Sequence, residues 1–193
     1  MLIYNNLIME TDDIFLMVAR VLYDKGYQEY VDAAAIVKAK YPNVELELLG
    51  ATDFLSPMGV PKSVLEKDVA DGKINYLGVT NDVPLYLKRK KVVVVVSSYH
   101  EGMNRALMEA LAMGKPVITT NIPGCKEMVD EGINGFLVPK KDSSALAKAM
   151  IRYIELSDAD KEKMEHASYK KAVEQFDVKH VLKRYDEIIE EMI

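Results

Sequence analysis

Residues 91–98, KVVVVVSS, place five consecutive valines between a lysine and two serines. Valine favours β structure because its branched side chain is stiff and packs well on a pleated surface. A strand with one solvated face alternates apolar and polar residues, and this run does not alternate. We therefore expect both faces of this strand to be buried, as in a central strand of a parallel sheet that helices cover on both sides.

On either side of the valines, short β-branched runs alternate with longer amphipathic stretches, the pattern of parallel strands joined by crossover helices. Six strands are predicted, at residues 14–19, 44–49, 74–77, 91–98, 116–120 and 135–138. Helices are predicted at 27–40, 62–70, 104–113 and about 125–130, with a short one capped by Asn81 or Asp82, and three more from about Ser143, Asp158 and Asp177. The predicted fold is α/β, a doubly wound, Rossmann-like parallel sheet of about six strands with helices on both faces.

The bulk composition limits the class of protein. A chain of 193 residues with 49% hydrophobic residues can bury a core, and we expect a single domain over residues 1–193. Cys125 is the one cysteine, so no disulfide framework is expected and a cytoplasmic setting fits best. The opening MLIYNNLIMETDD reads as neither signal peptide nor anchor, and no membrane span is predicted. A net charge of −5 argues against a nucleic-acid partner.

The last predicted helix carries an apolar stripe at helical spacing: Val181, Leu182, Tyr185, Ile188, Ile189 and Met192. Such a stripe is expected to be buried against something, and a second copy of the chain is one candidate partner.

Ligands of doubly wound sheets bind beyond the carboxyl ends of the strands. The first such loop carries Arg20 and Lys25, followed by Gly26 at the start of a helix. Two cations next to a helix N-terminus favour a phosphate group. The alternative is that both are solvated surface charges. After the third strand, the Asp82-Val83 turn could present backbone groups to a planar base, or Asp82 could simply cap a helix.

The loop after the valine strand leads to two carboxylates. Glu101 and Gly102 lie in the turn, and Glu109 is the one polar residue between positions 106 and 113. An unpaired charge among apolar neighbours costs several kcal/mol in rough terms, so Glu109 must face water, a cation or hydroxyls. A ribose diol offers two hydroxyls, and the two glutamates could hold two parts of one elongated ligand. The alternative is that Glu109 marks the exposed polar face of the helix.

Five segments together resemble a known family: RVLYDKG (20–26), YPNV (41–44), SYHEGMNRALMEALAMGKPVI (98–118), IPG (122–124) and NGFLVP (134–139). Over residues 14–190 the chain resembles the C-terminal, donor-binding half of the GT-B retaining glycosyltransferases of family 4, also called group 1. Two positions depart from the usual pattern, because Ser97 and Asn104 stand where proline is common.

The resemblance implies hexosyl transfer from a nucleotide diphosphate sugar to an acceptor glycan or lipid, with retention of configuration and without a metal. Arg20 and Lys25 would neutralise the leaving diphosphate, and Glu101 would bind the donor hexose. Glu109 would bind the ribose, the backbone at Gly102 and Met103 the sugar or phosphate, and the Asp82-Val83 turn the base. A UDP-linked donor and a role in polysaccharide biosynthesis are favoured, although the residues leave the base, the sugar and the acceptor open.

The resemblance also implies a second, N-terminal domain that binds the acceptor. With about a dozen residues before the first predicted strand, this chain is expected to bind donor but to transfer sugar poorly alone, unless another chain or domain supplies the acceptor site. A non-catalytic nucleotide-sugar binding or assembly module is the main alternative. A nicotinamide-dependent dehydrogenase is disfavoured because G-x-G-x-x-G does not follow the first strand. The D-x-D at 158–160 is explained more simply as a helix cap than as a metal site.

Overall fold

A computed structural model of the chain describes residues 13–88, 91–99 and 102–192. The described residues form one parallel sheet with the strand order β3-β2-β1-β4-β5-β6. The strands are β1 (Ile14–Val18), β2 (Glu45–Leu49), β3 (Asn75–Tyr76), β4 (Lys91–Val95), β5 (Val117–Thr120) and β6 (Gly135–Val138). The order reverses between β1 and β4, so the predicted doubly wound, Rossmann-like α/β fold is confirmed. The opening segment, which we expected to be neither a signal peptide nor a membrane anchor, has its first twelve residues outside the described part of the chain.

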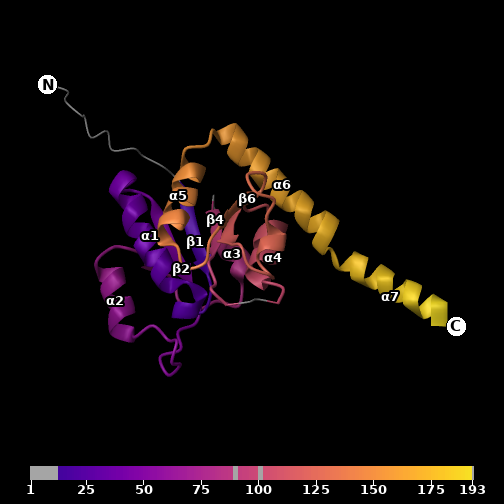
Figure 1. Cartoon of the computed structure of the whole chain (residues 1–193), viewed down its shortest axis with the longest axis horizontal. Helices are drawn as coiled ribbons and strands as arrows, with labels where there is room; N and C mark the ends of the chain where they lie inside the picture. Colours follow the sequence, from indigo (N-terminus) through magenta and orange to yellow (C-terminus); the bar gives the residue numbers. More distant parts are fainter. Residues whose placement is uncertain (1–12, 89–90, 100–101, 193) are drawn as a thin grey trace.

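Helices cover both faces of this sheet (Figure 1). They are η1 (Tyr23–Lys25), α1 (Tyr27–Lys40), α2 (Lys62–Ala70), α3 (Val83–Tyr86), α4 (Arg105–Ala112), η2 (Lys126–Met128), α5 (Ser143–Ile154), α6 (Asp158–Phe176) and α7 (Val178–Met192). Side chains of α1, α2 and α5 pack in one core, and side chains of α4 pack in the other.

The predicted helix near 125–130 is only the single 3₁₀ turn η2. Side-chain bonds from Asn134 replace helical bonds there: its amide donates to the Met128 carbonyl, and its Oδ1 accepts from the Asp130 backbone N–H. Asn134 is fully buried, so these bonds fix the chain where it turns into β6.

The valine run behaves as the sequence predicts. Val92, Val94 and Val96 belong to the core under α1 and α5, whereas Val93 and Val95 belong to the core under α4. β4 pairs with β1 on one side and β5 on the other, so its backbone is hydrogen-bonded along both edges. The strand is therefore buried on both faces and lies at the centre of the sheet.

The C-terminal helix α7 extends away from the body of the molecule (Figure 1). The predicted helix is confirmed, but the described part of its apolar stripe is exposed: Leu182, Tyr185, Ile188 and Ile189, together with Val178. The side chains of Val181 and Met192 lie outside the description. The expectation that the stripe is buried is therefore not met within this chain.

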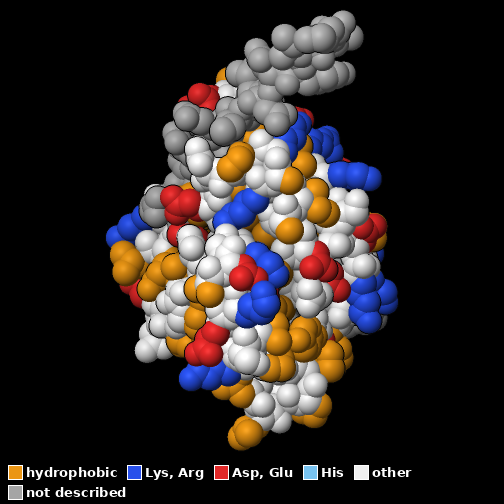
Figure 2. All heavy atoms as spheres, turned by 90° about the vertical axis from the view of Figure 1, so that its left-hand side faces the viewer, with side chains coloured by type: hydrophobic (Ala, Val, Ile, Leu, Met, Phe, Trp, Pro, Cys, Tyr) orange, Lys and Arg blue, Asp and Glu red, His pale blue; other side chains and the backbone are white. Residues whose placement is uncertain are grey.

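The face formed by α1 and α2 carries basic and acidic side chains side by side, and exposed apolar side chains gather at its lower end (Figure 2). The loop between β2 and α2, at the bottom of Figure 1, contributes Phe54, Leu55 and Met58, of which Leu55 is 97% exposed. Within the described residues, the helices are too short or too polar to cross a membrane.

The N-terminus of α1 is fixed against the end of β4 by Gly26. Gly26 has a φ of 86°, and a Cβ at this position would lie 2.4 Å from the Val96 carbonyl oxygen. The next residue, Tyr27, donates a hydrogen bond of 2.8 Å to the Asp68 carboxylate on α2. Burial, and then this bond, raises the pKa of Tyr27 above its usual value, so the hydroxyl remains a donor. Gly26 therefore sets how closely α1 approaches the valine strand.

We expect Gly26→Ala to destabilise the chain by about 2–5 kcal/mol, because alanine adds both a strained φ and a clash with a backbone carbonyl. Gly72→Ala is the matched control. Gly72 also has a positive φ, 70°, but a Cβ there meets open space, so we expect a loss of only about 1–2 kcal/mol. Urea unfolding of the three proteins measures the difference. Equal losses in the two variants would contradict the close-approach argument.

Candidate functional site

The loops that follow β1 and β4 are joined by hydrogen bonds at the carboxyl edge of the sheet. The Asp24 carbonyl accepts from the Ser98 backbone N–H at 2.9 Å and from the Ser98 hydroxyl at 3.2 Å. The Thr120 hydroxyl at the end of β5 donates to the Ser97 carbonyl at 2.8 Å. These bonds hold the loop after β4 between β5 and η1.

The cation Lys25 lies at this junction, directly before Gly26 and α1. Its ammonium is 5.9 Å from the centroid of the Tyr99 ring, close enough for a cation–π contact. Arg20 is exposed in the segment between β1 and η1. The structure thus places Lys25 at the predicted helix N-terminus and leaves Arg20 nearer to solvent. The binding of a phosphate group by Arg20 and Lys25 stays a prediction.

A cavity of about 650 Å³ opens beside the carboxyl end of β1. It is lined by Val18 of β1, by residues Thr80, Asn81, Asp82, Val83 and Pro84, and by Arg105, Ala106 and Glu109 of α4. The cavity lies where the strand order reverses, the position at which doubly wound sheets bind ligands. Two of the predicted elements, the Asp82-Val83 turn and Glu109, therefore share one cavity, whereas Arg20 and Lys25 do not line it.

Glu109 is paired with a cation that the sequence analysis overlooked. The Nε–H of Arg105 donates to Oε1 of Glu109 at 2.8 Å, and the Glu109 side chain is 25% exposed. Glu109 therefore faces a cation, which is one of the three surroundings that the sequence led us to expect for it. The signal was present in the sequence, because residues four apart share one side of a helix, and Arg105 lies just outside the apolar run that was considered.

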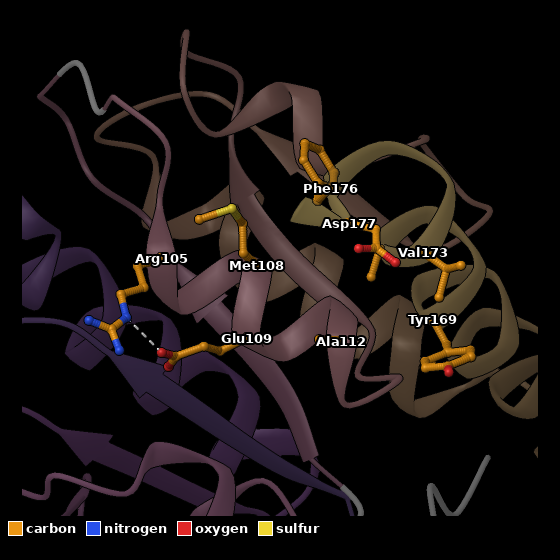
Figure 3. A pocket seen from close by; sticks show the side chains of 9 residues that line it. Arg105, Met108, Glu109, Ala112, Tyr169, Val173, Phe176 and Asp177 are labelled. Carbon is orange, nitrogen blue, oxygen red and sulfur yellow. Dashed lines mark hydrogen bonds and ion pairs between the residues drawn. The ribbon is translucent and has the colours of Figure 1, made fainter. Parts of the chain in front are cut away.

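A second hollow, of about 450 Å³, lies between α4 and α6 and is shown in Figure 3. Apolar side chains line most of it: Met108, Ala112, Tyr169, Ala172, Val173 and Phe176. Arg105 and Glu109 line both hollows, so this pair forms the ridge that separates them.

The remaining predicted site residues divide into three kinds. The Asp82 carboxylate caps α3 by accepting from the Leu85 backbone N–H at 3.2 Å, so the capping function is confirmed. Gly102 and Met103 are exposed, and a Cβ on Gly102 would meet open space. Glu101 lies outside the described residues, so its predicted role cannot be placed in the fold.

The structure gives local reasons for the two departures from the family pattern. The Ser97 hydroxyl donates to the Tyr99 carbonyl at 3.0 Å and accepts from the Tyr99 N–H at 3.2 Å. The Asn104 side chain caps α4 by accepting from the Leu107 N–H at 3.1 Å. Proline could make neither set of bonds.

The described residues contain no group of three or more histidine, cysteine, aspartate or glutamate side chains placed to hold a metal ion. The expected metal independence stays a prediction.

A family model described as glycosyl transferases group 1 matches residues 3–172 of the chain. The chain is 31% identical over 146 residues to the capsular polysaccharide biosynthesis glycosyltransferase CapM of Staphylococcus aureus, covering 71% of this chain and 35% of CapM. It is 27% identical over 154 residues to the N,N'-diacetylbacillosaminyl-diphospho-undecaprenol alpha-1,3-N-acetylgalactosaminyltransferase of Campylobacter jejuni, covering 80% of this chain and 39% of that protein.

The fold is similar to the crystal structure of Anabaena HepE in complex with UDP, with a TM-score of 0.82 and 25% identity. That match covers 92% of this chain and 48% of HepE. The chain thus spans less than half the length of each of these three relatives.

We expect Thr120→Val to lower the free energy of unfolding by about 1–3 kcal/mol, because the buried Ser97 carbonyl loses its donor. Amide hydrogen exchange at Ser98 and Tyr99 should also accelerate. Thr119→Val is the matched control, since the buried Thr119 hydroxyl donates to the Val95 carbonyl, within β4. It should cost similar stability without selective loss of protection at Ser98 and Tyr99. If both variants affect those two amides alike, Thr120 does not hold the loop.

Proposed function

The chain belongs to the group 1 glycosyl transferases, and we propose that it supplies the donor-binding half of an enzyme that transfers a hexosyl group from a nucleotide diphosphate sugar with retention of configuration. The observation that carries the proposal is the cavity at the β1–β4 switch point, which unites Glu109 of α4 with the Asp82-Val83 turn. A carboxylate at one wall and backbone groups at another suit a ribose joined to a planar base.

In this proposal, Glu109 accepts hydrogen bonds from the ribose hydroxyls, and the backbone of Asp82 and Val83 contacts the base. A uridine nucleotide is favoured because UDP occupies the matched HepE structure. The donor is thus a UDP-linked sugar, held without a metal ion.

The diphosphate would extend from the cavity toward the loop after β1. Lys25 lies directly before α1, whose N-terminus contributes the positive end of a helix dipole. Lys25 and Arg20 would neutralise the charge that develops on the leaving diphosphate. The backbone of Gly102, which is exposed in the loop before α4, would contact the sugar or the phosphate. Met103 and Glu101 complete the proposed contacts, with Glu101 on the hexose.

The acceptor site would come from a further domain or partner chain, and the acceptor is a glycan or lipid of polysaccharide biosynthesis. The relatives support this division, because about half of the matched HepE chain lies outside the region that the present chain covers. We propose that residues 1–193 act as one nucleotide-sugar-binding domain in the cytoplasm, with weak or no transfer alone. The test incubates the chain with a radiolabelled donor sugar in the presence of the acceptor half. Transfer of the label would support an enzyme, whereas binding without transfer would support a non-catalytic binding module.

Removal of either cation should weaken binding of the diphosphate but not of the nucleoside. We expect Lys25→Ala and Arg20→Ala each to weaken the binding of the nucleoside diphosphate, whether UDP, GDP or ADP, by about tenfold. The affinity of the matching nucleoside should change much less. Lys148→Ala on α5 is the control, because it removes the same charge from an exposed side chain that does not line the cavity. Isothermal titration calorimetry measures all four proteins. Unchanged diphosphate affinity in both variants would contradict the phosphate assignment.

A further inference from the structure

The ion pair between Arg105 and Glu109 is poorly explained by helix stability. Arg105 is the first residue of α4, after the cap Asn104, so its positive charge lies at the positive end of the helix dipole. Arginine precedes glutamate in the pair, which is the weaker order for residues four apart. The Arg105 side chain is also 87% exposed, and exposed pairs contribute little. Two local preferences of a helix are thus violated at the wall of a ligand cavity, where function commonly overrides them.

The pair leaves half of the carboxylate available. Arg105 uses its Nε–H on Oε1, and within the described part of the chain Oε2 of Glu109 makes no hydrogen bond. A carboxylate accepts at both oxygens, so Glu109 can keep the arginine and still accept from a hydroxyl.

The ion pair with Arg105 also determines which of the two neighbouring hollows the Glu109 carboxylate faces. Glu109 borders both the cavity beside β1 and the apolar groove between α4 and α6. Figure 3 shows its side chain turned toward Arg105 and away from Tyr169 and Val173 of α6. A glutamate side chain without this partner would be free to rotate, and fixing it on ligand binding would cost rotamer entropy.

We infer that Arg105 is a positioning residue, which holds the Glu109 carboxylate toward the cavity so that it reads the ribose hydroxyls of a nucleoside diphosphate. The inference rests on the proposed function and deepens it, because it assigns the discrimination between ribose and 2′-deoxyribose to a two-residue unit rather than to Glu109 alone. Preorganisation of the carboxylate lowers the cost of binding only for ligands that use it.

The test compares each of UDP, GDP and ADP with its 2′-deoxy counterpart by calorimetry. For whichever nucleotide binds, we expect the affinity of the unaltered chain to be about tenfold higher for the ribonucleotide than for its 2′-deoxy counterpart, as for a hydrogen bond to a charged group. Arg105→Met keeps much of the apolar stem and removes the guanidinium. It should reduce the preference to less than about threefold, with the affinity of the deoxynucleotide unchanged. When Arg105→Met is added to Glu109→Gln, the ratio of ribonucleotide to deoxynucleotide affinity should stay that of Glu109→Gln alone.

Arg152→Met is the matched control, because Arg152 is also exposed and paired with a glutamate, Glu131, but lies on α5 away from the cavity. It should keep the full preference. An unchanged preference in Arg105→Met would overturn the inference, and so would equal weakening of both nucleotides, which would mean that Arg105 contacts the ligand itself. If the unaltered chain binds none of the six nucleotides, the proposed function fails together with the inference.

Discussion

Burial of β4 on both faces is the constraint on which the rest of the structure depends. Five valines with no polar position among them require an apolar layer on each side of the sheet, and Val92, Val94 and Val96 pack in one layer while Val93 and Val95 pack in the other. Crossover helices must therefore lie on both faces. The strand order then reverses between β1 and β4, and a cavity at the carboxyl edge lies beside this reversal, between Val18 of β1, residues 80–84 and α4.

The site is held by contacts that cross this reversal. Gly26 allows α1 to begin against the end of β4, and Ser98 is bonded to the Asp24 carbonyl, so the loop that carries Lys25 is fixed beside the loop that leads to α4. On α4, Leu107, Ala110 and Leu111 are buried in the core, and Glu109 lies on the flank that borders the cavity, paired with Arg105. The same helix thus stabilises the sheet and supplies the carboxylate proposed to bind the ribose.

The sequence was most informative where a strong local preference agrees with the tertiary structure. The valine strand and the cap at Asp82 were both predicted correctly. It was misleading where tertiary contacts decide the outcome. The helix near 125–130 is shortened by side-chain bonds from Asn134, which lies beyond it in the turn to β6, and no local pattern indicates them. The α7 stripe was recognised, but the residues of it that the structure describes are exposed rather than buried.

The account is tested most directly by a crystal structure of the chain with UDP. The predicted result has the nucleotide in the cavity beside β1, with its ribose hydroxyls within hydrogen-bonding distance of the Glu109 carboxylate and its diphosphate directed toward Lys25. Binding of UDP in the groove between α4 and α6, or anywhere that leaves Glu109 without a ribose contact, would contradict it.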